Sequence, residues 1–461
     1  IKLLFILKDH LSKRRIRQLK LLLIISILSS FAEVISLASV IPFLGVLANP
    51  ANIWQYSLTQ NVVGIIGVKD PEGLLLPITI FFALAAISSG AVRLLNIYLS
   101  GRISAAIGSD LSCEAYKRTI YQPYQYHLTR NSSSIIASIT KDINNLIYLI
   151  IYPLIQLMGA TFITFSLLFT LIAINWKVAI STGMIVFIIY YIALFNTLPP
   201  LARISNSLVD LNQKLVQLLQ EGIGAIRNVL LEQTQPFYTE LYFKTDRSLR
   251  RLEAKGDFLN AYPRYLIEPT GIALIGISGY LMVKSGGLES ALPTLGALAL
   301  GALRLLPMAQ RIYEGCSMPQ NAKGSLANLI NLLEKPLTRD YLLKNRITLN
   351  LKNNIECKNV YFSYSGEESN VIENLNLKIN KGEFIGIKGK TGSGKSTTID
   401  LIMGLILPSS GQILIDGKDI NSYDSLNMRA WRSGIVHVPQ SIFLSDTTIA
   451  ENIAFGIQSE N

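Results

Sequence analysis

The residues with the clearest chemical meaning form one short loop of glycine, lysine and hydroxyl side chains. Its members are Gly389, Lys390, Thr391, Gly392, Ser393, Gly394, Lys395, Ser396 and the following Thr397. They fit the pattern G-x-x-x-x-G-K-[ST], in which a curled backbone directs several N–H groups at one phosphate. The spacing assigns Lys395 to the β- and γ-phosphates as the catalytic contact, and Ser396 to Mg²⁺. A chance glycine-rich turn before a helix is the competing interpretation.

Such a loop must be placed by a strand that enters it and a helix that leaves it. Glu383–Ile387 has the pattern of a buried strand, Thr397–Met403 has that of a helix, and Pro408 lies just beyond. The N-terminus of a helix adds a dipole that favours an anion. Because strand, loop and helix occur in this order, the phosphate-binding interpretation is favoured over the chance turn.

The composition of the whole chain is that of an integral membrane protein. Half of the 461 residues are hydrophobic and only 16% are charged, and the mean hydropathy is +0.37. A net charge of +11 would otherwise indicate a nucleic-acid partner. Here the basic residues cluster beside apolar segments, as the positive-inside rule expects, so no nucleic-acid partner is predicted. Three widely spaced cysteines form no metal or disulfide pattern.

Six apolar segments are long enough to cross a bilayer as helices. They lie at about 21–48, 74–99, 146–174, 178–198, 263–283 and 291–312. A signal peptide is the competing interpretation of the first, but its apolar run is about twice the usual length. Lysine and arginine are concentrated at 1–20, 100–142 and 199–261. This bias places both termini in the cytoplasm.

The pattern changes near Met318 from long apolar helices to short strands and turns. We therefore expect a transmembrane domain at 1–317, a linker at 318–350, and the N-terminal part of a soluble α/β domain at 351–461. Two smaller features are also expected, a short helix at Ser325–Leu333 and a short interfacial helix within Ile53–Val68.

Further motifs surround the phosphate-binding loop. Asn359–Tyr364 precedes it, Ser410–Gly417 follows it, and Val436–Gln440 comes later. Six spans followed by this series resemble an ABC exporter half-transporter of type I. The resemblance implies ATP and Mg²⁺ as cofactors, adenine stacking on Tyr364, and contact of Gln440 with Mg²⁺ and the attacking water. By residue type alone, Tyr364 also suits an ordinary strand and Gln440 a solvated loop.

The resemblance covers nearly the whole chain, with one departure. ABC proteins continue with a signature loop, a Walker B aspartate, a catalytic glutamate and a switch histidine, whereas this sequence stops at Asn461. His437 does not match the switch histidine and is expected in a strand. We therefore expect a fragment of a longer protein. The resemblance implies that ATPase activity belongs to the full-length homodimer, in which each phosphate-binding loop faces the partner's signature loop.

Four arginines lie in or at the ends of predicted spans: Arg93, Arg264, Arg304 and Arg311. Charged residues in spans are costly and usually functional. The rise of a helix places three of them near the inner leaflet and Arg304 higher, two turns from Arg311 on the same helix. Because arginine binds phosphate oxygens bidentately, they predict a basic cavity for an anionic head group. Snorkelling and salt bridges, including pairing with Glu33 and Glu268, are the alternative.

Segments of the membrane domain are similar to those of lipid-linked oligosaccharide flippases of the PglK type. They are Ser30–Glu33, Ile41–Phe43, Pro263–Glu268, Ala302–Pro307 and Gln310–Ile312. The similarity implies ATP-driven export or flipping of an amphipathic lipid-linked substrate by a homodimer in the bacterial inner membrane. Coupling would run through Tyr121–Thr129 and Arg203–Gln213. Two alternatives remain: a multidrug or lipid exporter of the same fold, and a truncated nucleotide-binding regulator without hydrolysis.

Overall fold

The structure is a computed structural model that describes residues 2–48, 50, 54, 70–286, 288–337, 349–364, 369–423, 426–440, 442 and 444–456. The chain forms two compact units. One comprises Ile1–Ile120 and Asn131–Lys335, and the other Tyr121–Arg130 and Pro336–Asn461. The expected interfacial helix at Ile53–Val68 lies outside the described residues, apart from Trp54.

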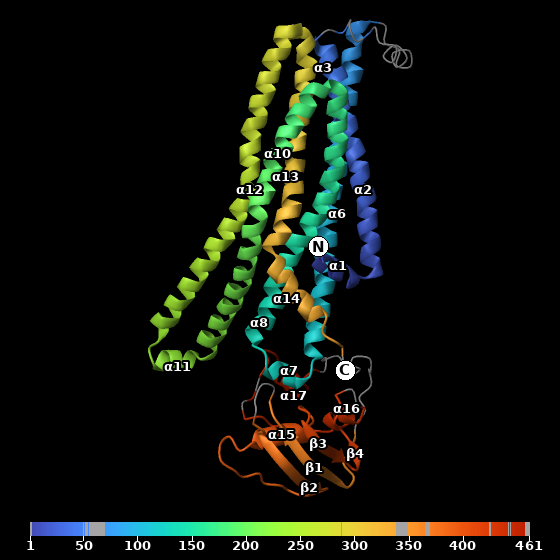
Figure 1. Cartoon of the computed structure of the whole chain (residues 1–461). Coiled ribbons are helices and arrows are strands. Elements are labelled where there is room, and N and C mark those ends of the chain that lie inside the picture. The colour runs from blue at the N-terminus through green and yellow to red at the C-terminus, as the bar shows by residue number, and fades with distance from the viewer. Residues whose placement is uncertain are drawn as a thin grey trace. The chain divides into compact units, whose positions relative to one another are not determined.

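The first unit is built of helices, several of them very long (Figure 1). They are α1 (Lys2–Asp9), α2 (Lys13–Ala38), α3 (Val40–Ala48), η1 (Pro71–Leu74), α6 (Leu75–Ile120), α8 (Ser132–Ala137), η2 (Ser138–Asp142), α9 (Ile143–Asn145), η3 (Leu146–Ile151), α10 (Tyr152–Gly224), α11 (Ile226–Leu231), α12 (Gln235–Gly286), α13 (Leu288–Asn321) and α14 (Lys323–Leu333). Within the described residues, five helical stretches are long and apolar enough to cross a membrane, and they contain the first five predicted spans. The sixth predicted span lies in α13.

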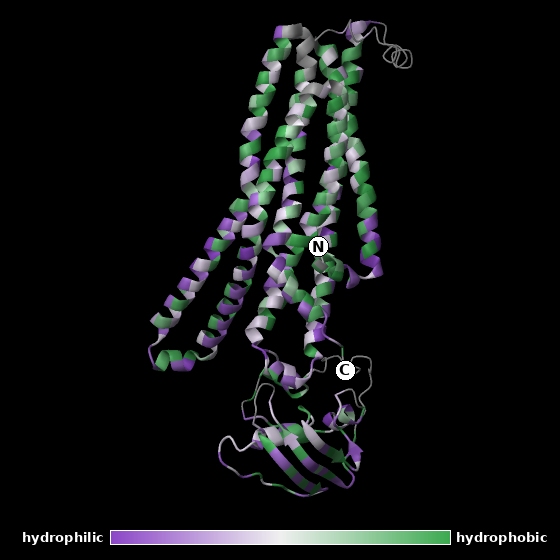
Figure 2. Cartoon of the chain, in the orientation of Figure 1, coloured by the Kyte–Doolittle hydropathy of each residue, from purple (hydrophilic) through white to green (hydrophobic). Residues whose placement is uncertain are grey.

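These stretches have 35 to 50 residues, whereas about 20 residues cross a bilayer. They therefore extend well beyond the membrane. Figure 2 shows hydrophilic residues gathering around α11 and the adjoining ends of α10 and α12, while apolar residues dominate the opposite half of these helices. The membrane domain thus combines an apolar part with long polar extensions.

The third predicted span runs from η3 into α10 and the fourth lies in α10, which doubles back on itself. A Cβ placed on Gly183 would lie 3.7 Å from Cδ2 of Leu168. In a straight helix these two residues would be about 22 Å apart. The chain therefore reverses direction between them, in the region where the sequence predicts a turn at Asn175–Lys177.

The short helix expected at Ser325–Leu333 is confirmed as α14, and it packs into the core of the first unit. Its residues Leu326, Leu329, Ile330 and Leu333 are buried in one cluster with Leu111 and other residues of α6 and η3. Their spacing places them on one face of the helix. The beginning of the segment 318–350, expected as a linker, is therefore part of the helical unit.

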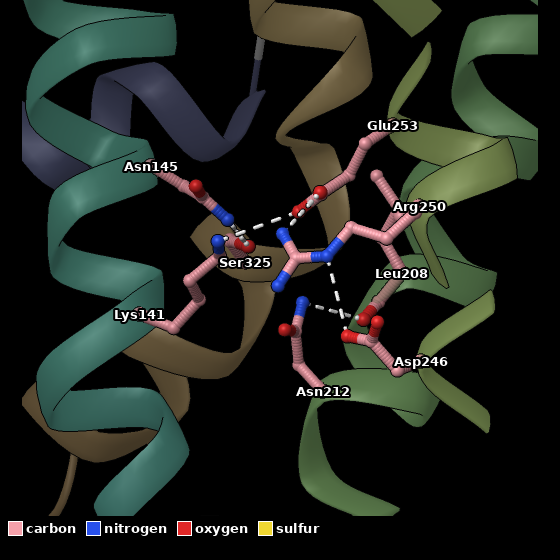
Figure 3. Close-up of polar contacts among 8 residues, drawn as sticks. All are labelled: Lys141, Asn145, Leu208, Asn212, Asp246, Arg250, Glu253 and Ser325. Atoms are coloured by element: carbon pink, nitrogen blue, oxygen red, sulfur yellow. Dashed lines mark hydrogen bonds and ion pairs between the residues drawn. The ribbon is translucent and has the colours of Figure 1, made fainter. Parts of the chain in front are cut away.

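An ion-pair network joins α12 to η2 (Figure 3). The Glu253 carboxylate lies 3.4 Å from Nζ of Lys141 and 2.9 Å from Nη1 of Arg250. Arg250 also pairs with Asp246, one turn earlier in α12, at 3.2 Å. Glu253 of α12 thus pairs with both Lys141 and Arg250, and its pair with Lys141 links α12 to η2.

Replacing Glu253 with glutamine should lower the free energy of unfolding by about 1 kcal/mol, because both ion pairs are partly exposed and weak. Thermal unfolding of the full-length protein at low salt would measure the loss, which should shrink in 1 M salt. The matched control is Glu240→Gln, which removes the more exposed pair with Lys244 and should have no measurable effect. Equal losses in the two variants would show that Glu253 does not join the helices.

The second unit contains a four-stranded antiparallel sheet with strand order β2-β1-β3-β4. Its strands are β1 (Asn354–Phe362), β2 (Ile372–Asn380), β3 (Ser410–Ile415) and β4 (Lys418–Asp419), and its helices are α7 (Tyr124–Leu128), α15 (Lys395–Ile402), α16 (Leu426–Arg432) and α17 (Ile449–Ile453). The buried side chains of Val360, Phe362, Ile413 and Trp431 form part of one core with Leu401 of α15. The sheet therefore holds the helix that follows the glycine-rich loop.

A two-residue turn connects β3 and β4. Asp416 and Gly417 both have positive φ, +49° and +77°, as type I′ hairpin turns require. The Asp416 carboxylate accepts backbone N–H groups of Lys352, Asn353 and Asn354 at 2.6–3.0 Å. Although desolvation opposes the shift, these bonds lower the pKa of Asp416.

The strand predicted at Glu383–Ile387 is wrong. This segment has no regular secondary structure, and Phe384 is fully exposed. The strand expected around His437 is also not formed, and Val436 and Val438 are exposed. A strand requires a neighbour that takes up its backbone hydrogen bonds, and none of the four strands of the described residues pairs with either segment. Apolar local composition alone did not decide the structure.

Candidate functional site

The glycine-rich loop leads directly into α15, as the sequence predicts. Gly392 and Gly394 have φ values of +84° and +80°, which residues other than glycine rarely adopt. A Cβ on Gly394 would also lie 2.6 Å from Cδ1 of Ile372, and a Cβ on Gly389 would lie 2.5 Å from Oγ of Ser393. The tight curl of the loop therefore depends on glycine both for its backbone angles and for its close contacts.

Lys395 lies folded over this loop. Its Nζ donates to the carbonyl oxygens of Gly389 and Lys390 at 2.8 and 2.7 Å. The Ser396 side chain is exposed, whereas Thr397 is buried. No acidic residue lies in the first turn of α15. The helix N-terminus, the ammonium group and the exposed hydroxyl thus form a site suited to a phosphate and its metal ion.

Tyr364 lies beside the loop. Its ring is half-buried and meets Phe362 edge-on, with centroids 4.9 Å apart. Its hydroxyl lies 3.1 Å from Oγ1 of Thr397, in the first turn of α15. The structure therefore brings together these two residues, which the sequence assigned to one nucleotide site.

Gln440 is exposed, and no contact within the described residues joins it to the loop. The segment before it is near α15, because Asp400 of that helix interacts electrostatically with His437. Burial raises the pKa of Asp400, and His437 opposes this shift. The structure thus places the segment of Gln440, but not its side chain, beside the loop helix.

Two of the four arginines converge on one buried carboxylate. Arg304 of α13 donates to Glu33 at 2.7 Å and to Oγ of Ser36 at 2.9 Å, both on α2. Arg93 of α6 lies 3.9 Å from the other oxygen of Glu33, whose side chain is only 7% exposed. The separate level predicted for Arg304 is wrong for the charged groups, because Arg304 and Arg93 lie against the two oxygens of the same Glu33 carboxylate.

The other two arginines have different partners. Arg311 donates to Oε1 of Gln156 at 3.1 Å. It is repelled by Arg93 and attracted by Glu314, which lies three residues later on α13. Arg264 pairs with Glu268 at 3.9 Å, and their side chains are 55% and 50% exposed. The sequence identified Glu33 and Glu268 as counter-charges but missed Ser36 and Gln156. Their polarity within apolar helices was the available signal.

We name Arg93, Arg304 and Arg311, together with Glu33, the arginine cluster. Arg93 and Arg304 lie against the buried Glu33 carboxylate, and Arg311 interacts electrostatically with Arg93, so the cluster extends across helices α2, α6 and α13. Arg264 lies outside this cluster, with its own carboxylate one turn away on α12. The three arginines thus outnumber the two carboxylates with which they interact, Glu33 and Glu314.

Comparison with known proteins connects these features. A family model described as "ABC transporter transmembrane region" matches residues 21–262, and one described as "ABC transporter" matches residues 372–461. The ATP-dependent lipid A-core flippase of Paraburkholderia xenovorans is 22% identical over 82% of this chain and 63% of its own length. That of Syntrophus aciditrophicus is 27% identical over 80% of this chain and 61% of its own length. The chain thus spans less than two thirds of these relatives.

A third relative and a solved structure cover more of the chain. The heterocyst differentiation ATP-binding protein HepA of Nostoc sp. is 24% identical over 97% of this chain and 73% of its own length. The structure of a bacterial Atm1-family ABC exporter with ATP bound aligns with a TM-score of 0.69 at 18% identity, over 96% of this chain and 74% of that one. This likeness shows the exporter fold. Since the transmembrane-region model alone matches more than half of its residues, the chain belongs to the ABC transporter family.

Proposed function

We propose that the full-length protein is an ATP-driven exporter that flips an anionic amphipathic lipid, such as a lipid-linked oligosaccharide, across the bacterial inner membrane. The observation that carries this proposal is the arginine cluster. Arginine binds phosphate bidentately, and three arginines that outnumber the carboxylates beside them, Glu33 and Glu314, leave capacity for an anionic head group. The names of the flippase relatives support a lipid, and a multidrug exporter is less favoured.

The second unit would supply the driving force by binding ATP with Mg²⁺. Lys395 would leave its two carbonyl partners to hold the terminal phosphates, and the exposed Ser396 hydroxyl would hold the metal. The backbone N–H groups from Gly389 to Thr397 would surround the phosphates. Tyr364 would stack on adenine. Gln440 would reach the metal and the attacking water only after the site closes, since no contact in the described residues brings it there.

We also propose a homodimer with both termini cytoplasmic, divided into a membrane domain at 1–317, a linker at 318–350 and an ATP-binding part at 351–461. Tyr121–Arg130 is supported as a coupling segment, because it belongs to the compact unit that holds the glycine-rich loop. Within that unit the Tyr423 hydroxyl contacts Gln125 of α7 at 3.5 Å. ATP binding would favour the outward-facing cavity, and hydrolysis would reset it.

Replacing Tyr364 with alanine should weaken ATP binding about tenfold, because base–aromatic stacking contributes about 1–3 kcal/mol. Tyr364→Phe keeps the ring and removes only the hydroxyl contact with Thr397, so its affinity should stay within about threefold. Titration of the full-length protein with a fluorescent ATP analogue measures both. Equal weakening in the two variants would assign Tyr364 to holding the loop rather than to stacking.

ATP hydrolysis by the full-length protein in liposomes tests the lipid assignment. A polyprenyl-pyrophosphate-linked sugar should stimulate hydrolysis, and phosphatidylcholine should not. Arg311→Gln should lose this stimulation while basal hydrolysis persists, because Arg311 hydrogen-bonds only a neutral partner, Gln156, within the described residues. Equal rates with and without the lipid would remove the reason for proposing an anionic lipid.

A further inference from the structure

A cavity of about 380 Å³ lies between the N-terminal half of α2 and the middle of α6. Three arginines line it: Arg14 and Arg15 from the first turn of α2, and Arg102 from α6. None of them belongs to the arginine cluster. The cavity therefore needs an explanation apart from the proposed transport site.

The positive charge of this cavity is only partly balanced. Arg15 makes two hydrogen bonds to the Asp110 carboxylate at 2.8 and 3.0 Å and a third to Gln18 at 2.9 Å. Arg14 and Arg102 are exposed, and Arg102 has a long contact of 3.4 Å with the Tyr98 hydroxyl. The fixed Arg15–Asp110 pair thus leaves two arginines able to turn toward an anion.

Apart from Gln18, the rest of the cavity wall is apolar. Leu22 and Ile103 are buried, and Ile25 is half-buried. Arg14 and Ile25 lie on the same helix, about 16 Å apart along its axis. That length covers the head group and the first part of an acyl chain, since the polar regions add about 5–8 Å on each side of the hydrocarbon core.

We propose that this cavity binds an anionic phospholipid of the inner leaflet. Arg14 and Arg102 contact its phosphate, and its acyl chain lies against Leu22, Ile25 and Ile103. Basic pockets between membrane helices on the cytoplasmic side bind such head groups. A free phosphate would use only the arginines, so the apolar wall favours the lipid.

Native mass spectrometry of the full-length protein tests this site by the dissociation constant of the first bound dioleoyl-phosphatidylglycerol. Arg14→Gln/Arg102→Gln should weaken that binding about 30-fold, since each cation near an anionic surface contributes about fivefold. The double variant keeps the Arg15–Asp110 pair. Ile25→Trp, which fills the apolar wall and keeps every arginine, should also weaken it. Arg251→Gln, an exposed arginine of α12, is the matched control and should bind like the parent.

Two comparisons identify the ligand. Dioleoyl-phosphatidylcholine should bind weakly, and with the same affinity to the parent and to every variant. Inorganic phosphate at 10 mM should not displace the anionic lipid. The proposal is overturned if the double variant binds phosphatidylglycerol as tightly as the parent does. It is also overturned if the parent binds phosphatidylcholine as tightly as phosphatidylglycerol. Displacement by inorganic phosphate, or unchanged binding in Ile25→Trp, would likewise rule out the lipid.

Discussion

Replacing Lys395 with alanine should reduce ATP hydrolysis by the full-length protein about 100- to 1,000-fold. Removing one preorganised donor to a charge that develops in the transition state typically has this effect, and Lys395 is the cation of the loop pattern. In the structure its Nζ already lies among the loop carbonyls, within reach of a phosphate held by the same loop. Phosphate release at saturating ATP measures the rate.

Lys388→Ala is the matched control for this prediction. Lys388 lies one residue before the loop and its side chain is exposed, so its loss should change the rate by less than about twofold. Thermal unfolding of both variants separates a local effect from misfolding. More than a tenth of the parental rate in the folded Lys395→Ala variant would contradict the assignment of Lys395.

Replacing Arg304 with alanine should lower the free energy of unfolding by about 3 kcal/mol. Among the described residues, the substitution leaves the buried Glu33 carboxylate with only the distant ion pair to Arg93, and an unpaired buried charge is costly. Adding Glu33→Gln should recover part of this loss, because no ionised carboxylate then stays buried. Unfolding of the full-length protein by SDS titration measures the single variants and the double variant.

Arg264→Ala is the comparison for Arg304→Ala. Its pair with Glu268 is long and half-exposed, so the loss should be below about 1 kcal/mol. The coupling between Arg304 and Glu33 should exceed about 1 kcal/mol. Equal losses for the two arginines, with additive effects at Glu33, would show that the buried pair does not stabilise the helices.

Local sequence patterns predicted the parts of this structure that are determined by residues close together in the sequence. The spacing of Gly389, Gly394, Lys395 and Ser396 predicted a loop that enters a helix, because backbone angles and helix starts are set locally. Long apolar segments predicted the membrane helices for the same reason, since about 20 such residues cross a bilayer whatever they contact.

Long-range pairing was not predictable in this way. Glu33 and Arg304 are 271 positions apart. The sequence offered Glu33 as a possible counter-charge, but only the packing of α2 on α13 shows that Glu33 is buried against Arg304. The strand expected at Glu383–Ile387 failed because a sheet needs partners that local composition does not specify.

ATP-dependent movement of a labelled anionic lipid between leaflets tests the proposed function most directly. The full-length protein is placed in liposomes whose outer leaflet contains a fluorescent anionic lipid. Dithionite, which bleaches only the label that remains in the outer leaflet, then reports how much lipid has moved inward. Inverted molecules, which expose the ATP-binding unit outside, should move the lipid inward when ATP and Mg²⁺ are added. The Lys395→Ala protein and the parent without ATP should not. Equal dithionite accessibility in all three samples would contradict an ATP-driven lipid flippase.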